Sequence, residues 1–291
     1  MTVWELCECM RGAMDEYGIE ASQLESQELT AKATGVNRRD VLRWKTIEVT
    51  AEQRKIAGEM LIQRLRGKPV AYIIGEWDFY GRTFLVTPDV LIPRSDTEVL
   101  CHVALKEIRK RENPKVLDLC CGSGCIGISL ALEAPCALVT AVDVSMAALE
   151  VTRRNAARYA LPKERYNAIW GDVYRLGSIP GRYDVVVCNP PYITAKEMQE
   201  LDSSVRDYEP ELALYGGEDG LDFYRIIARR SMVAMHPGGC ILVECGWKQA
   251  KEVMALFHGG GLEHIETIRD LNGIDRVVRA YVPEDLEGLK E

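Results

Sequence analysis

The sequence has little that would place it in a membrane or in an oxidising compartment. No apolar run approaches the roughly 18 residues that a helix needs to cross a bilayer. The opening segment MTVWELCECM lacks the basic and apolar regions of a signal peptide. The ten cysteines are scattered and are not spaced as a disulfide scaffold. We therefore expect a cytoplasmic protein with reduced thiols and no membrane contact.

Features of metal and nucleophile sites are also scarce. Cys120, Cys121 and Cys125 contain no C-x-x-C pair and have no histidine nearby in the sequence, so we expect no metal. The four histidines are scattered and show no Ser/Asp or Cys partner pattern. The net charge of −8 argues against broad binding to nucleic-acid phosphates.

Three stretches of the sequence have different patterns. Residues 1–75 carry apolar residues at helical spacing with few Gly and Pro, which predicts a small all-helical domain. Residues 76–95 are rich in aromatic and β-branched residues, which predicts a β-hairpin linker. In residues 96–291 helices alternate with strands, and Ser95 and Glu98 have the spacing of a capping box for the first of these helices.

Charge is distributed unevenly along the chain. Residues 1–75 hold 11 basic and 11 acidic residues, so the acidic excess lies in the remainder. Within residues 37–68, nine Lys and Arg residues accompany only four Asp and Glu residues. This basic stretch is either a solvated helical face or a docking surface for a macromolecule.

Seven segments have the composition of strands. They lie near residues 115–119, 138–143, 167–170, 183–188, 239–245, 264–268 and 275–282. The first five alternate with helical segments, which is typical of a parallel sheet, and the last two form a closing pair. The expected fold is therefore α/β, with a Rossmann-like, mostly parallel seven-stranded sheet.

The first strand leads into a glycine-rich turn and a helix. The turn Cys120-Cys121-Gly122-Ser123-Gly124 would let a ligand approach the backbone, and the helix N-terminus supplies free N–H groups. Asp143 ends the second strand, where a carboxylate can accept hydrogen bonds from ribose hydroxyls. Asp172 follows the third strand and is placed to meet an adenine amino group. Taken singly, Asp143 could instead cap a helix and Asp172 could stabilise a turn.

The fourth strand ends in the tetrad Asn189-Pro190-Pro191-Tyr192. Neither proline can donate to a strand ladder, so the strand must end there. The stiff turn presents the Asn189 amide and the Pro190 carbonyl as hydrogen-bond partners, with the Tyr192 ring beside them. This suits a planar group that carries an NH2, although a Pro-Pro loop with an Asn cap is the structural alternative.

The loop that follows Asp118, the two carboxylates and the tetrad together resemble class I S-adenosylmethionine methyltransferases that act on a planar nitrogen. More specifically, the chain resembles the HemK/PrmC protein-glutamine methyltransferases, which modify bacterial peptide-chain release factors. The resemblance covers nearly the whole length, including residues 81–86, 91–98 and 192–225. Cys120 and Ser95 depart from it, because many members have glycine and a second proline there. A sulfonium cofactor has no pyrophosphate to bind, so neither change weakens the resemblance.

The resemblance implies S-adenosylmethionine as the methyl donor, with S-adenosylhomocysteine as the product. The residues implied to contact the cofactor are Cys120, Cys121, Gly122, Ser123, Gly124, Asp143, Asp172, Val173 and Asn189. Asn189, Pro190, Pro191 and Tyr192 would receive the glutamine of a Gly-Gly-Gln loop, and methylation there would modulate translation termination. Asn189 and Pro190 would accept the amide N–H groups, while Tyr192 packs against the amide plane. No general base is evident.

The resemblance also suggests roles for the domains. Residues 1–75 would dock the protein substrate, and residues 96–291 would form the catalytic domain. We expect a monomer without direct nucleic-acid contact. The alternative is an adenine-N6 DNA or RNA methyltransferase, because the same tetrad can hold the amino group of a flipped base. The sequence shows no basic groove or target-recognition domain for that role. A catalytically silent binding module is disfavoured because loop, carboxylates and tetrad are all intact.

Overall fold

The computed structural model of the protein describes residues 1–285. The last six residues of the domain expected over 96–291 lie outside the described residues. The chain forms two compact units: unit 1 contains Met1–Glu76 and Asp202–Tyr208, and unit 2 contains the other described residues. The chain therefore passes between the units at residues 76/77, 201/202 and 208/209.

Unit 1 is helical, as predicted for residues 1–75. Its elements are α1 (Val3–Glu16), α2 (Ser22–Thr34), the 3-10 helix η1 (Arg38–Lys45), α3 (Ala51–Leu65) and α4 (Val70–Ile74). Thr2 and Thr50 begin α1 and α3 with capping boxes, which satisfy backbone N–H groups that lack intrahelical partners. Val3, Cys7 and Trp44 are buried together between these elements.

The segment Asp202–Tyr208 belongs to unit 1 although it follows the tetrad in the sequence. It contains the short helix α9 (Ser203–Arg206). The Tyr208 hydroxyl donates to the Arg66 carbonyl oxygen at 3.0 Å. The Tyr208 ring lies beside Gly67, since a Cβ at that glycine would stand 3.7 Å from its Cε2 atom. No local pattern in the sequence indicated this packing.

A two-stranded sheet begins where unit 1 ends. It pairs β1 (Glu76–Phe79) with β2 (Arg82–Leu85), which confirms the predicted hairpin. Tyr80 and Gly81 both have positive φ angles, 51° and 71°, as the tight turn between hairpin strands requires. Residues 86–94 form no strand and continue as a loop.

The predicted capping box at Ser95 is wrong. Ser95–Thr97 form the 3-10 helix η2, and α5 (Glu98–Ile108) starts directly after it without a side-chain cap. The Glu98 carboxylate instead accepts the Tyr80 backbone N–H at 2.8 Å. This bond ties α5 to the hairpin. Because the Thr97 side chain does not cap α5, its hydroxyl is available for other partners.

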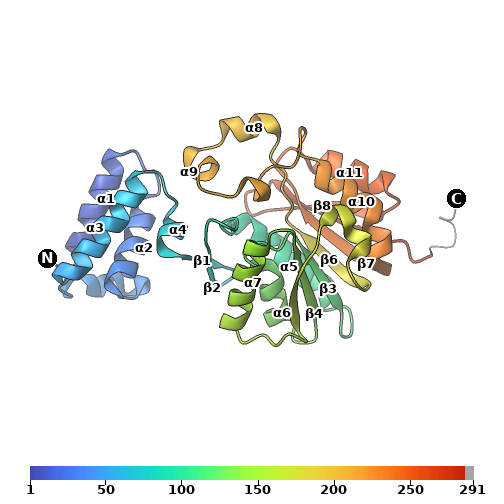
Figure 1. Ribbon diagram of the computed structural model, residues 1–291, viewed down its shortest axis with the longest axis horizontal. Coiled ribbons are helices and arrows are strands. Elements are labelled where there is room, and N and C mark those ends of the chain that lie inside the picture. Colours follow the sequence, from blue (N-terminus) through green and yellow to red (C-terminus); the bar gives the residue numbers. More distant parts are fainter. Residues whose placement is uncertain (286–291) are drawn as a thin grey trace. The chain divides into compact units, whose positions relative to one another are not determined.

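Unit 2 is built on a seven-stranded sheet, as predicted (Figure 1). Its strands are β3 (Lys115–Leu119), β4 (Leu138–Asp143), β5 (Tyr166–Trp170), β6 (Tyr183–Cys188), β7 (Met235–Glu244), β8 (Glu263–Arg269) and β9 (Asp275–Tyr281). Their order is β5-β4-β3-β6-β7-β9-β8, with parallel pairing except where β9 meets β7 and β8. Strand β7 begins earlier than predicted because Met235 pairs with Tyr183 across an irregularity.

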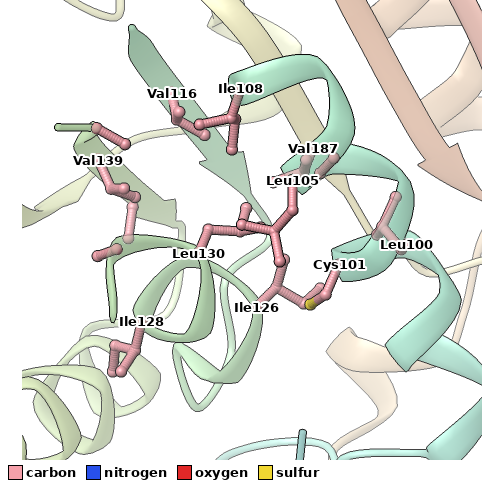
Figure 2. Close-up of a cluster of buried hydrophobic side chains, with 14 of the residues drawn as sticks. Leu100, Cys101, Leu105, Ile108, Val116, Ile126, Ile128, Leu130, Val139 and Val187 are labelled. Atoms are coloured by element: carbon pink, nitrogen blue, oxygen red, sulfur yellow. The ribbon is translucent and has the colours of Figure 1, made fainter. Parts of the chain in front are cut away.

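Helices cover both faces of this sheet. On one face, α5, α6 (Cys125–Glu133) and α7 (Met146–Arg158) pack against alternate strand residues, including Val116, Val139 and Val187 (Figure 2). On the other, α10 (Asp222–Ala234) and α11 (Ala250–Gly259) pack against residues such as Leu117 and Val186. Strands buried on both faces read as continuous apolar runs, which explains why they were recognisable in the sequence.

The remaining elements are the 3-10 helices η3 (Val173–Ser178) and η4 (Glu211–Ala213) and the short helix α8 (Ala195–Glu200). Within residues 1–285, none of the helices combines the length and apolar character that crossing a membrane would require.

Candidate active site

The predicted site residues follow the carboxyl ends of adjacent parallel strands. The chain moves outward from β3 through β4 to β5 and then returns to β6 on the other side of β3. This reversal creates a crevice between the loops after β3 and β6, the usual ligand position in an open α/β sheet. The glycine-rich turn after β3 and the tetrad after β6 border that crevice.

The turn after β3 has an irregular backbone. Cys120, Gly122 and Gly124 have φ angles of 56°, 53° and 79°, in the left-handed region. Glycine adopts this region without strain, whereas Cys120 incurs a cost there. At Gly124 a side chain would also collide with Thr152 and Tyr166, both 2.8 Å from the position of a Cβ. The Cys121 N–H donates to the Val142 carbonyl at 3.0 Å, which joins the turn to β4.

Asp143 connects the same turn to the end of β4. One carboxylate oxygen accepts the Gly122 N–H and the other accepts the Ser145 N–H, each at 2.9 Å. The cap of α7 is Ser145, so Asp143 is not a helix cap. Burial raises the pKa of Asp143, while the backbone hydrogen bonds oppose that rise. A carboxylate has about four acceptor positions, so Asp143 can still accept from a ligand's hydroxyl groups in addition to the backbone N–H groups.

Asp172 has a structural function. It caps η3, with Oδ1 accepting the Tyr174 N–H at 2.9 Å. The neighbouring Val173 is buried. Both residues also line the cavity described below, so Asp172 caps η3 and borders the cavity at the same time.

Asn189 follows β6 and is partly buried. Its Nδ2 donates to Thr97 Oγ1 at 3.3 Å. The Tyr192 hydroxyl lies 3.5 Å from Glu244 Oε1, and burial raises the pKa of Tyr192. Pro190 and Pro191 are buried.

The backbone of the tetrad is held by segments from elsewhere in unit 2. Gln249 Nε2 donates to the Tyr192 carbonyl at 3.0 Å and to the Gly220 carbonyl at 3.3 Å. A Cβ at Gly220 would stand 2.3 Å from the Tyr192 carbonyl oxygen, and one at Gly216 would stand 2.7 Å from the Pro191 carbonyl oxygen. Only glycine allows these close approaches. The glycines after the tetrad therefore help to fix its conformation.

These elements surround a cavity of about 460 Å³. The predicted residues that line it are Cys120, Cys121, Gly122, Ser123, Asp143, Asp172, Val173, Asn189 and Pro191. Gly124, Pro190 and Tyr192 are not among its lining residues. Gly124 instead begins α6 and faces Thr152, and the Tyr192 hydroxyl faces Glu244. The cavity thus unites the carboxylates with one side of the tetrad.

Two further walls of the cavity are formed by residues that were not predicted to belong to the site. Residues between Pro88 and Thr97 form one wall, and Pro210, Leu212 and Ala213 contribute to another. The buried Glu209 carboxylate links these walls, since it accepts the Ile92 N–H at 3.1 Å and pairs with Arg94. Both segments lie within the part of the chain that resembles the family, and this resemblance was the only sign in the sequence that they could belong to the site. Their position on the cavity depends on contacts over more than 100 residues of sequence.

The charges around the cavity favour a cationic ligand. Asp89, Asp143 and Asp172 line it, and the lining cation Arg94 is paired with Glu209. An ionised carboxylate can accept hydroxyl or amino hydrogens and attracts positive charge. No cluster of three or more His, Cys, Asp or Glu residues suited to a metal ion occurs in residues 1–285. The arrangement can hold a polar cationic molecule against the Asn189 side chain.

Comparisons with known proteins agree with this geometry. The sequence matches the family model of the methyltransferase small domain over residues 96–204 and that of the PrmC N-terminal domain over residues 5–75. A release factor glutamine methyltransferase from Geobacter sulfurreducens is 38% identical over 278 residues, which cover 95% of each chain. One from Bordetella pertussis is 39% identical, over 89% of this chain and 95% of the relative.

Among solved structures, a methyltransferase from Pyrococcus furiosus is similar to this chain with a TM-score of 0.53. The match covers 78% of this chain and 99% of that one, at 16% sequence identity. This likeness concerns the fold alone.

Proposed function

Because this chain belongs to the release factor glutamine methyltransferase family, we propose that it methylates the glutamine of the Gly-Gly-Gln motif in peptide-chain release factors. The methyl group of S-adenosylmethionine is transferred to the side-chain amide nitrogen, which modulates translation termination. One observation supports this proposal above the others: the glycine-rich turn after β3 and Asn189 after β6 line a single cavity.

The cavity residues fit S-adenosylmethionine. A volume of about 460 Å³ is in the range of small-molecule sites. The ligand's sulfonium and amino groups outweigh its one carboxylate, and the lining carboxylates complement that charge. Asp143 would bind ribose hydroxyls through its remaining acceptor positions, and Asp172 would meet the adenine amino group. A Cβ at Gly122 would meet no atom of the described residues within 4 Å, so the backbone there can be approached closely. When bound, the cofactor supplies an electrophilic methyl carbon.

Asn189 and Pro190 would orient the reacting amide. A carboxamide nitrogen is a poor nucleophile because its lone pair is delocalised into the carbonyl group. The Asn189 side-chain oxygen and the Pro190 carbonyl oxygen each accept one N–H, which aligns the nitrogen for displacement. These acceptors bind more tightly as positive charge develops on the nitrogen, so they stabilise the transition state. The Tyr192 ring packs against the amide and excludes water. We assign no general base.

Unit 1 would dock the protein substrate through its basic stretch. Of the nine Lys and Arg residues in residues 37–68, six are exposed: Arg39, Arg43, Lys45, Arg54, Lys55 and Arg66. Binding energy from such a remote surface can be used to position the reacting glutamine.

The test is incubation with labelled S-adenosylmethionine and a purified release factor, followed by peptide mass mapping. We expect one methyl group on the glutamine of the Gly-Gly-Gln motif. A parallel reaction contains DNA and RNA oligonucleotides in place of the protein. Label in an oligonucleotide, with none in the release factor, would contradict the proposal.

A further inference from the structure

A hydroxyl group behind Asn189 has two partners. Thr97 is 2% exposed, and its Oγ1 accepts a hydrogen bond from Asn189 Nδ2 at 3.3 Å. The same hydroxyl faces the Glu244 carboxylate, and its interaction with that carboxylate lowers the pKa of Glu244. The Thr97 side chain does not cap α5, although Thr97 directly precedes that helix. Its hydroxyl is directed toward Asn189 and Glu244 instead.

Glu244 is placed where it can control that hydroxyl. It ends β7, beside β6, and is 1% exposed. Besides Thr97, it faces the Tyr192 hydroxyl, 3.5 Å from Oε1. Its Oε2 is buried and has no hydrogen-bond partner among the described residues. Such a carboxylate can only accept hydrogen bonds while it is ionised.

The direction of the hydrogen bonds follows from this chemistry. Ionised Glu244 takes the single proton of the Thr97 hydroxyl, so the Thr97 oxygen can act only as an acceptor toward Asn189. The Asn189 amide must then present its NH2 group to Thr97. The opposite orientation would set two oxygen atoms against each other without a proton between them. The Asn189 oxygen is therefore directed away from Thr97.

We propose that Thr97 and Glu244 are positioning residues that fix the orientation of the Asn189 amide, so that its oxygen faces the substrate nitrogen. We call the three interacting side chains of Glu244, Thr97 and Asn189 the relay. The inference rests on the proposed function for its catalytic consequence, but the orientation of the amide can be measured without turnover.

The relay depends on the charge of Glu244. Burial raises the pKa of Glu244 to about 7, against the hydrogen bonds from Thr97 and Tyr192 and the attraction of Arg276. Once protonated, Glu244 can donate to the Thr97 oxygen and compete with Asn189 for it. The titratable and charged groups around Glu244 are Asp96, Cys101, Cys125, Tyr192, Tyr224, Cys245 and Arg276. Lowering the pH through about 7 should therefore loosen the Asn189 amide.

The direct test is nuclear magnetic resonance of the Asn189 side-chain NH2 group, assigned by its loss in Asn189→Ala. In the unmodified protein, we expect one downfield, exchange-protected proton that titrates near pH 7. Thr97→Val should abolish the protection and Thr97→Ser should retain it, while Glu244→Gln should abolish the titration. Equal protection in the Val and Ser variants, or an unchanged titration in Glu244→Gln, would overturn the relay.

Kinetics test the consequence. Thr97→Val should lower kcat about tenfold, the effect of one hydrogen bond, and leave the Kd of S-adenosylmethionine within about twofold. Thr97→Ser should recover most of the rate. Matched controls are Thr30→Val and Glu107→Gln, which alter a buried hydroxyl and a buried carboxylate outside the cavity lining. Absence of methylation by the unmodified protein would refute the proposed function, and the resonance data would still decide the relay.

Discussion

Asp118 offers a test of how burial of a charge limits stability. It lies in β3, is fully buried, and accepts the Gly127 N–H at 2.9 Å through Oδ2. Its Oδ1 has no partner among the described residues. Burial raises the pKa of Asp118 from 3.8 to about 7, although the Gly127 hydrogen bond lowers it, and the charge of Asp143 adds to the rise. We predict that Asp118→Asn stabilises the protein at alkaline pH.

The magnitude follows from proton linkage. Between pH 5 and 7 an unfolded Asp is ionised, whereas folded Asp118 keeps its proton, so stability falls as the pH rises. Each pH unit in this interval costs about 1.36 kcal/mol, or about 2.7 kcal/mol over the two units. Asparagine has nearly the same shape and can still accept the Gly127 N–H. Its NH2 group can donate to the nearby Tyr166 hydroxyl, which is buried and has no partner among the described residues.

The assay is urea denaturation of both proteins at pH 5 and pH 8, followed by circular dichroism. We compare the free energy of unfolding of Asp118→Asn with that of the unmodified protein. From pH 5 to pH 8 this difference should shift by about 2.7 kcal/mol in favour of the variant. Asp207→Asn, which removes an exposed carboxylate, should show a difference within about 0.5 kcal/mol at both pH values. An equal difference at pH 5 and pH 8 for Asp118→Asn would refute the reasoning.

Three further predictions concern the cavity and unit 1. Asp143→Ala should weaken S-adenosylmethionine binding in calorimetry by roughly 1.5–3 kcal/mol, because hydrogen bonds to a charged group are lost; unchanged affinity in a folded variant would remove Asp143 from the ribose site. Asn189→Ala should lower turnover by roughly 100-fold or more, because an oriented acceptor is lost. Tyr192→Phe should be milder, and near-normal turnover of Asn189→Ala at saturating substrate would make the tetrad structural. Arg39→Glu combined with Arg43→Glu should reduce kcat/KM on a full-length release factor and leave cofactor affinity unchanged. If kcat/KM does not change, this basic surface does not dock the substrate.

The sequence was most informative where local composition determines structure. The five parallel strands contain largely apolar runs, and their carboxyl ends had to share one edge of the sheet. The cavity could therefore be predicted as a meeting place of the turn after β3, Asp143, Asp172 and Asn189, although the predicted residues Gly124, Pro190 and Tyr192 do not line it. A hairpin within residues 76–95 likewise follows from local patterning, and the structure places its turn at Tyr80-Gly81.

Other features depend on partners that are distant in sequence. Ser95 and Glu98 have the spacing of a capping box, but the Tyr80 N–H competes successfully for the Glu98 carboxylate. Glu209 binds Ile92 and Arg94, more than 100 residues earlier in the sequence. These contacts form only once the sheet has brought the segments together. Local spacing cannot reveal which of several possible partners a buried carboxylate will take.

The assignment of Asp202–Tyr208 to unit 1 has a consequence for biosynthesis. The ribosome releases the chain from its N-terminus, so unit 1 cannot be complete until residue 208 has emerged. By then the strands from β3 to β6 have already been made. The two units must therefore mature with overlapping timing. A nascent chain that ends before Tyr208 would contain the helices of Met1–Glu76 without the hydrogen bond from Tyr208 to Arg66. After synthesis, a protease cut between residues 76 and 77 would separate Met1–Glu76 from the segment Asp202–Tyr208 of the same unit, which the later fragment carries.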